Sequence, residues 1–134
     1  MVLGIGTDLM EIERIEHSLQ RFGTRFLDRI YTPFEISYCQ RKRHNAAESF
    51  AARFAAKEAG AKALGTGISR GVQWTEIEVR NLPGGRPTLL WHGRAAARAA
   101  AMGVEAVHLS LTHSRALAMA VVLVEGTPPT GDHL

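Results

Sequence analysis

The chain has 134 residues, of which 46% are apolar and 22% charged, so we expect one ordinary globular domain with little room for a second. No stretch approaches the roughly twenty apolar residues of a membrane span, which excludes a transmembrane protein. The net charge of +3 is uneven, because residues 14–62 hold ten Lys and Arg against five Asp and Glu.

The first predicted elements are one strand and two helices. An apolar run over residues 2–5 predicts a strand that ends in a Gly-x-Gly-x turn before Asp8. Apolar residues then recur at helical spacing, which predicts an amphipathic helix over residues 11–22. Thr32 and Pro33 supply a cap and a first-turn proline, and they predict the start of a second helix.

Three arginines are spaced to form a basic stripe along the first helix if that helix continues through residue 25. They are Arg14, Arg21 and Arg25. A basic stripe in a basic half favours an anionic partner, which could be a nucleic acid, a phosphate ligand or an acidic protein. A solvated surface explains the same charges without any partner.

The rest of the chain predicts further helices and strands of a mixed fold. An Ala-rich helix closed by glycines is predicted over residues 46–64. The other elements are strands over residues 74–79 and 88–91 joined by a turn at 81–85, a helix over 93–102, and strands over 107–112 and 116–124 joined at 113–115. The tail from Gly126 carries prolines and glycine and is expected to fray.

Two carboxylates are candidates for a metal site. Asp8 follows the first strand, and Glu58 lies in the middle of the Ala-rich helix, one turn before Lys62. An acid in this position is most often solvated or paired with the lysine four residues on. Two carboxylates from separate elements would also suit Mg²⁺, which takes one or two protein oxygens and completes its octahedron with water and substrate phosphates.

Two further segments give weaker signals. The glycine-rich loop of residues 65–71 could approach a phosphate with its backbone N–H groups, although a plain helix stop is the commoner explanation. His113 could donate to a phosphate or move a proton, although most turn histidines only satisfy local hydrogen bonds. None of the six histidines has zinc-ligand spacing, and the chain shows no nucleophile elbow.

Three segments in this order resemble the holo-acyl-carrier-protein synthases, the short type of the 4′-phosphopantetheinyl transferase family. They are Gly4-Ile5-Gly6-Thr7-Asp8 with Glu11 to Ile15; Arg53-Phe54-Ala55-Ala56-Lys57-Glu58-Ala59 with Lys62 and Gly65-Thr66-Gly67; and Leu109-Ser110-Leu111-Thr112-His113-Ser114. A Gly-Arg-Pro at residues 85–87 also matches the family. The ordered set is specific and covers nearly the whole chain.

The resemblance implies an α+β fold in which a long helix packs on a small antiparallel sheet. It further implies one domain over residues 1–125, a frayed tail over 126–134, and a homotrimer with active sites between subunits. Asp8 and Glu58 would bind magnesium, and Glu58, Lys62 and His113 would serve in catalysis. Coenzyme A would contact a larger set, which comprises Asp8, Arg53, Phe54, Glu58, Lys62, Gly65, Gly67, Arg86, Pro87, Thr112 and His113.

The implied reaction moves 4′-phosphopantetheine from coenzyme A to a serine of an apo acyl carrier protein and releases 3′,5′-ADP. The acidic carrier would dock on Arg14, Arg21 and Arg25. Glu58, His113 or a metal-bound water could accept the serine proton. The carrier could belong to fatty-acid synthesis or to a polyketide or peptide synthetase.

A non-catalytic basic binding module is the less favoured alternative, because the aromatic residues fit core positions better than exposed stacking positions. We expect neither a nucleic acid nor a membrane as partner. Residues 1–4 lack the blocks of a secretory signal, and Cys39 is the only cysteine, so a reducing cytoplasm fits.

Overall fold

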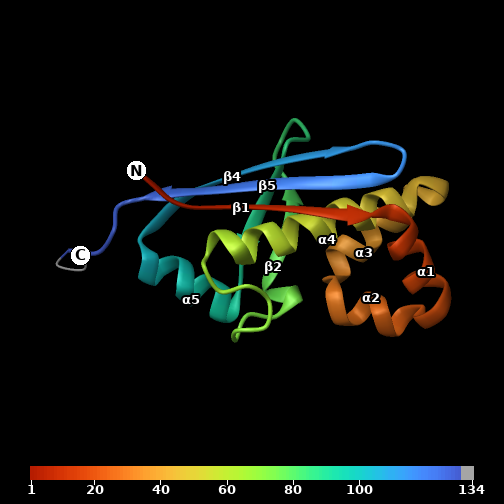
Figure 1. The fold of residues 1–134 in the computed structure, drawn as a ribbon, viewed down its shortest axis with the longest axis horizontal. Helices are drawn as coiled ribbons and strands as arrows, with labels where there is room; N and C mark the ends of the chain where they lie inside the picture. The colour runs from red at the N-terminus through yellow and green to blue at the C-terminus, as the bar shows by residue number, and fades with distance from the viewer. Residues whose placement is uncertain (131–134) are drawn as a thin grey trace.

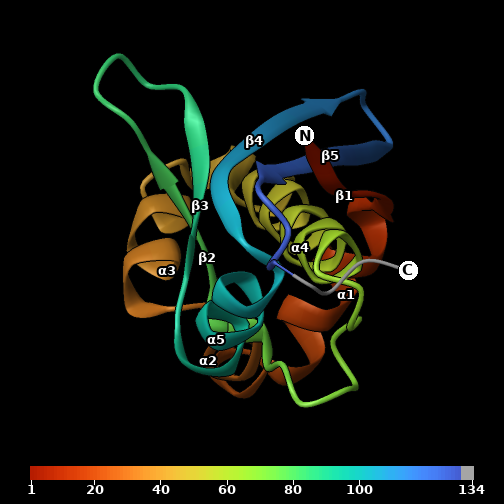
Figure 2. The same ribbon diagram turned by 90° about the vertical axis from the view of Figure 1, so that its left-hand side faces the viewer.

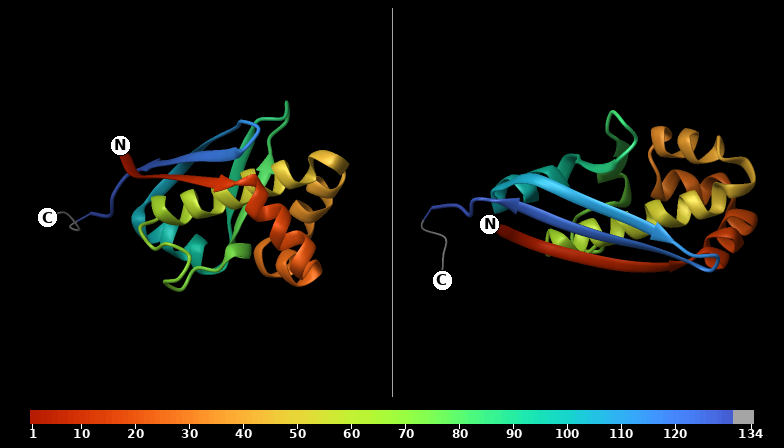
Figure 3. Two further views of the ribbon diagram at one scale, coloured as in Figure 1. Left: turned by 45° about the vertical axis from the view of Figure 1, so that its right-hand side comes forward. Right: turned by 90° about the horizontal axis from the view of Figure 1, so that it is seen from above.

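The computed structural model describes residues 1–130, and it confirms the expected α+β fold. Helix α4 (Ala46–Ala63) packs against an antiparallel sheet of three strands in the order β1-β5-β4. These strands are β1 (Val2–Glu11), β5 (Leu117–Gly126) and β4 (Val104–His113). The three strands run side by side over α4 when the molecule is seen from above (Figure 3).

The other elements flank α4 at its two ends and on one side (Figure 1). They are α1 (Ile12–Phe22), α2 (Thr24–Ile30), α3 (Pro33–Gln40), the 3-10 turns η1 (Arg43–Asn45) and η2 (Trp74–Glu76), the hairpin β2 (Ile77–Asn81) and β3 (Pro87–Trp91), and α5 (Gly93–Met102). The hairpin stands on the side of α4 away from β1 (Figure 2). Within residues 1–130, no helix combines the length and apolarity needed to cross a bilayer.

The Gly-x-Gly segment is part of a strand, so the turn predicted before Asp8 is wrong. Strand β1 continues through it to Glu11. Gly4 and Gly6 face α4, and a Cβ atom on either would collide with a helix carbonyl, that of Ala63 or Ala59 respectively. The glycines therefore let the helix backbone pack directly on the strand backbone.

The first helix ends earlier than the basic stripe requires. Gly23 has a φ of 55°, in the left-handed region that favours glycine, and its N–H donates to the Leu19 carbonyl. A separate helix, α2, then begins at Thr24, which the sequence did not predict as an element of its own. Arg25 therefore lies on α2, and the three arginines do not form one continuous stripe.

The core is built around the alanine-rich faces of α4. Ala55, Ala59 and Ala63 are buried, and they pack with buried apolar residues from two other parts of the fold. Strand β5 contributes Ala120, Val122 and Val124, and the β2–β3 hairpin contributes Ile77, Val79 and Leu89. Small helix residues against β-branched strand residues fix α4 between the sheet and the hairpin.

The opposite face of the sheet is not covered by any element of residues 1–130. Side chains of β1 and β5 on this face are apolar and exposed: Ile5 by 61%, Leu9 by 58%, Leu117 by 38% and Met119 by 36%. Ile5 pairs with Leu123 and Leu9 pairs with Met119, so these residues form one adjoining surface. An apolar sheet face of this kind is typical of an interaction surface.

Strand β5 reaches Gly126, where the predicted tail begins. The N–H of Gly126 donates to the Met1 carbonyl, and the N–H of Thr127 donates to the Gly103 carbonyl. The remainder of the predicted frayed tail, residues 131–134, lies outside the described residues.

We expect Gly6→Ala to lower the free energy of unfolding by about 3 kcal/mol, because the added methyl group forces apart two packed backbones. Denaturant unfolding followed by circular dichroism measures this loss. Thr7→Ala on the exposed face of the same strand is the control and should change stability little. Equal stability of the two variants would contradict the packing role of Gly6.

Candidate functional site

Asp8 and Glu58 come from two elements that pack directly on each other. Side chains alternate along a strand, so Asp8 shares the helix-facing side of β1 with the glycines. Gly6 lies against Ala59 of α4. Strand β1 and helix α4 run in opposite directions. Asp8, two residues after Gly6, therefore lies beside the helical turn that precedes Ala59, and Glu58 is the last residue of that turn.

Lys62 completes this group. Its Nζ donates to Asp8 Oδ1 at 3.2 Å and to the Thr7 carbonyl at 3.0 Å. The i, i+4 pair that the sequence favoured for Glu58 is therefore replaced by an ion pair to Asp8 on the neighbouring strand. Within residues 1–130, Glu58 has no ion-pair partner.

Burial raises the pKa of Glu58, the negative charge of Asp8 raises it further, and the positive charge of Lys62 opposes both. Because the pKa of Glu58 is higher in the folded than in the unfolded chain, ionisation of Glu58 costs stability as the pH rises through the folded pKa. A site that holds two carboxylates together at such a cost is a candidate for chemistry.

The chemistry of these donors suits a hard divalent cation. The charge of Asp8 contributes to the raised pKa of Glu58, so the two carboxylates interact, and a divalent cation would relieve their repulsion. Residues 1–130 contain no group of three or more His, Cys, Asp or Glu side chains placed to hold a metal.

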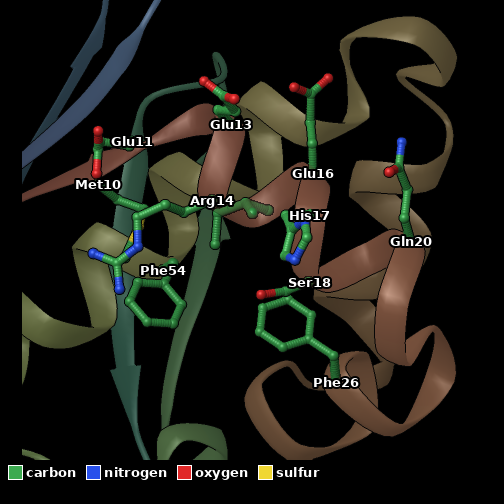
Figure 4. Close-up of a pocket in the computed structure, with 11 residues that line it drawn as sticks. Met10, Glu11, Glu13, Arg14, Glu16, His17, Ser18, Gln20, Phe26 and Phe54 are labelled. Atoms are coloured by element: carbon green, nitrogen blue, oxygen red, sulfur yellow. The ribbon is translucent and has the colours of Figure 1, made fainter.

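A groove opens between α1, α2 and α4, and neither Asp8 nor Glu58 is among the residues that line it. Its volume is about 740 Å³, and its lining includes Met10, Arg14, His17, Phe26 and Phe54. Arg14 reaches over towards Phe54, and the acidic side chains of α1 point away from this aromatic part (Figure 4). The groove therefore combines an aromatic part and the positive charge of Arg14 with a rim of glutamates.

A second cationic group lies on the other side of α4, next to β4. Arg53 is 6% exposed, and its guanidinium stacks 4.1 Å from the centre of the Tyr38 ring. Its Nη1 donates to Ser49 Oγ, and among the described residues its Nε has no hydrogen-bond partner. Together with Lys42 and His113 it lines a small hollow of about 330 Å³.

Sequence reasoning singled out Arg53 and His113 but missed the rest of this cationic group. Lys42 Nζ lies 4.9 Å from the Tyr38 ring centre, and Glu48 Oε2 lies 3.7 Å from His113 Nδ1. The basic run of residues 41–43 could have indicated Lys42 as a member of this group. From the sequence, that run contributed only to the count of positive charges.

The structure divides the predicted site residues into two sets. Asp8, Phe54, Glu58, Lys62 and the carrier-docking residue Arg14 gather on the β1 side of α4. Arg53 and His113 lie on the β4 side, and Arg86 and Pro87 lie on the loop and strand that form the tip of the β2–β3 hairpin (Figure 2). Strands β1 and β4 are the two edges of the sheet, so one chain does not bring the sets together.

The remaining predicted residues lie outside both sets. Gly65 and Gly67 follow α4 with φ values of 78° and 64°, so they form a helix stop. The side chain of Thr112 is exposed, and by strand alternation it points to the uncovered face of the sheet.

Arg21 and Arg25 are both exposed on the α1–α2 end of the molecule, but they contact different surroundings. The Arg21 guanidinium lies 5.4 Å from the centre of the Phe22 ring. Arg25 lines a hollow with Phe22, Phe26 and Arg29. Arg29 extends the predicted basic surface and was not singled out from the sequence.

Comparison with known proteins shows the family of the chain. Residues 4–122 match the 4′-phosphopantetheinyl transferase superfamily. The chain belongs to this superfamily. It is 56% identical over 125 residues to the holo-acyl-carrier-protein synthase of Koribacter versatilis, covering 93% of this chain and 99% of the relative. The Solibacter usitatus enzyme of the same name is 54% identical with the same coverage.

Solved structures of the superfamily share the fold. The Helicobacter pylori holo-acyl-carrier-protein synthase in complex with coenzyme A is 32% identical with a TM-score of 0.79, and the match covers 90% of this chain and 99% of that one. The Plasmodium yoelii acyl carrier protein synthase with ADP bound is 29% identical with a TM-score of 0.83, covering 95% and 97%.

We expect the pKa of Glu58 to respond to its two charged neighbours in opposite directions. Asp8→Asn should lower it by removing a like charge, and Lys62→Met should raise it by removing an opposite charge. Carbon-13 NMR of glutamate carboxyl groups across a pH titration of the metal-free protein measures both shifts. Glu13→Gln, an exposed change on α1, is the control and should leave the Glu58 titration in place. A titration unmoved by both neighbouring substitutions would show that the three groups do not meet.

Proposed function

We propose that the chain transfers the 4′-phosphopantetheine group of coenzyme A to a serine of an apo acyl carrier protein and releases 3′,5′-ADP. The observation that carries this proposal is the Asp8–Glu58–Lys62 group between β1 and α4, in a chain of this superfamily. The names of the curated relatives and the coenzyme A and ADP in related structures support it. One buried thiol, Cys39, is compatible with a cytoplasmic location, which is part of the proposal.

Asp8 and Glu58 would hold Mg²⁺, because two carboxylates on separate backbones match what this ion takes from proteins. When bound, the ion would neutralise charge on the pyrophosphate of coenzyme A and so ease its displacement. Lys62 lies close enough to Asp8 to move between that carboxylate and a substrate phosphate, and its positive charge would stabilise the leaving ADP.

The bond changes define what the protein residues must do. The serine oxygen of the carrier forms a bond to the phosphorus that carries pantetheine, and the bond from that phosphorus to the ADP oxygen breaks. The serine proton passes to a base. Glu58, His113 or a water would accept this proton.

The carrier would dock over α1 and α2. Arg14 lines the groove, while Arg21 and Arg25 offer exposed positive charge further along this end of the molecule. Acidic carriers would be steered to this end, and the aromatic groove would take the apolar contacts of the docked partner. The docking surface would thus have an apolar centre for contact energy, surrounded by positive charge.

The second half of the site would come from a neighbouring copy in a homotrimer. Arg53, a buried cation on α4, has an Nε without a hydrogen-bond partner among the described residues, and it lines a hollow with His113 of the edge strand β4. Coenzyme A has a phosphate apart from its pyrophosphate, and the cationic groups of Arg53, Lys42 and His113 would receive that second anion, with Glu48 beside His113 in the same hollow. Association through the open sheet face would place one β4 edge near another β1 edge.

The decisive experiment is the intact mass of an apo carrier protein after incubation with the enzyme, coenzyme A and Mg²⁺. We expect a gain of one phosphopantetheine that a chelator prevents. Asp8→Asn and Glu58→Gln should fold and lose at least about a hundredfold in kcat/KM, because each removes a charge from the metal site.

Glu105→Gln is the control, since it removes an exposed carboxylate of β4 that lies outside the groove and outside the predicted site residues. It should match the unchanged enzyme with each of the fatty-acid, polyketide and peptide-synthetase carriers tested. No gain of mass with any of these carriers would rule out the transfer. A gain that survives chelation and both site variants would rule out the metal role.

A subunit-mixing experiment tests the composite site. Glu58→Gln and His113→Ala should each be nearly inactive alone, and an equal mixture that has exchanged subunits should recover about a quarter of the sites, because each composite site needs one intact half from each copy. Light scattering should give the mass of a trimer. A trimer whose mixture exchanges subunits and stays inactive would place both halves within one chain.

A further inference from the structure

Lys57 is a buried charge next to Glu58 that no step of the proposed reaction uses. Its side chain is 0% exposed, and its Nζ lies 2.6 Å from Oε1 of Glu35, which is also 0% exposed. The same ammonium donates to the Ile77 carbonyl at 2.7 Å and to the Trp74 carbonyl at 3.1 Å. All three of its N–H donors are therefore in use.

Glu35 is equally saturated. Its carboxylate accepts the N–H of Thr32 at 2.9 Å and the N–H of Val79 at 2.6 Å in addition to Lys57. The pair thus joins α4 to α3, to strand β2 and to the η2 turn at one point. Apolar contacts alone would hold these elements together without fixing their relative orientation. The five hydrogen bonds and ion-pair contacts of Lys57 and Glu35 fix both the spacing and the orientation of the elements.

The bond from Lys57 to Trp74 leads directly to the substrate groove. The Trp74 ring packs on the Phe54 ring with 4.5 Å between the ring centres and 36° between the planes. Phe54 lines the groove beside Arg14, one helical turn before Glu58. Lys57 therefore holds the η2 turn in place, and the Trp74 side chain of that turn packs behind Phe54 in the wall of the groove.

We propose that Lys57, clamped by Glu35, is a positioning residue that fixes Trp74 behind Phe54 and so sets the groove wall against which the apo carrier lies. The groove's role as the carrier site rests on the proposed function. The placement of Trp74 does not, so it can be tested separately. The Asp8–Glu58 group depends instead on the glycines of β1, so metal affinity should not follow the state of Lys57.

The placement test uses fluorescence. The chain has two tryptophans, so Trp91→Phe leaves Trp74 as the only reporter. In this background Lys57→Met keeps the length of the side chain and removes its charge. We expect the Trp74 emission to shift to longer wavelength and its quenching by acrylamide to rise at a temperature at which circular dichroism shows a folded chain. Unchanged emission and quenching would overturn the proposal whatever the enzyme's activity.

The functional test compares Lys57→Met with Trp74→Ala, which leaves the buried ion pair and its carbonyl acceptor in place. Per folded molecule, both should raise the KM for the apo carrier about tenfold with kcat changed less than about threefold, and both should keep the wild-type affinity for Mn²⁺. Trp91→Ala, a change in the other part of the core, should lower stability and leave the KM unchanged. If Lys57→Met does not fold, Trp74→Ala alone decides, and a wild-type KM in that variant overturns the proposal.

Discussion

The direct packing of α4 on β1 is the constraint on which the site depends. Two glycines on the strand and alanines on the helix leave no side chain between the backbones that could adjust. The positions of Asp8 and Glu58 are therefore set by the main chain, and the two carboxylates are held together despite their repulsion. Burial of Glu58 in this packing raises its pKa, and the charge of Asp8 raises that pKa further; in the proposed site a divalent cation would relieve the repulsion.

Two lysines on α4 have different roles because they lie on different faces of the helix. Lys57 points into the protein and is enclosed by Glu35 and two carbonyl groups, so its charge is fully compensated and unavailable. The side chain of Lys62 is 49% exposed and contacts Asp8, and in the proposed reaction it would exchange that partner for a phosphate. The buried Lys57 therefore stabilises the fold, and the exposed Lys62 is the one that can take part in the proposed reaction.

The sequence predicted the long helix, the α+β class and the two carboxylates, because the helix signal is local and the motifs recur in a fixed order. It misassigned the Gly-x-Gly segment, since glycine serves both turns and close backbone contacts, and only the packing partner distinguishes them. It did not identify Lys57, because its acidic partner Glu35 lies on another helix and no local spacing joins them. The separation of Arg53 and His113 from Asp8 depends on strand order, which short motifs do not encode.

Two apparently separate features of the single chain have one physical explanation in the proposed trimer. The outer face of the sheet exposes Ile5, Leu9 and Met119 to water, and burying it would supply a hydrophobic driving force for association. The guanidinium of Arg53 is buried without an acidic partner among the described residues, and an anion bound at the junction of two copies would compensate it. Association would thus bury the apolar face and assemble the anion site in the same step. In the proposed trimer, the carboxylates of one copy and the cations of the next would together form one active site. Catalysis would therefore require the assembled enzyme.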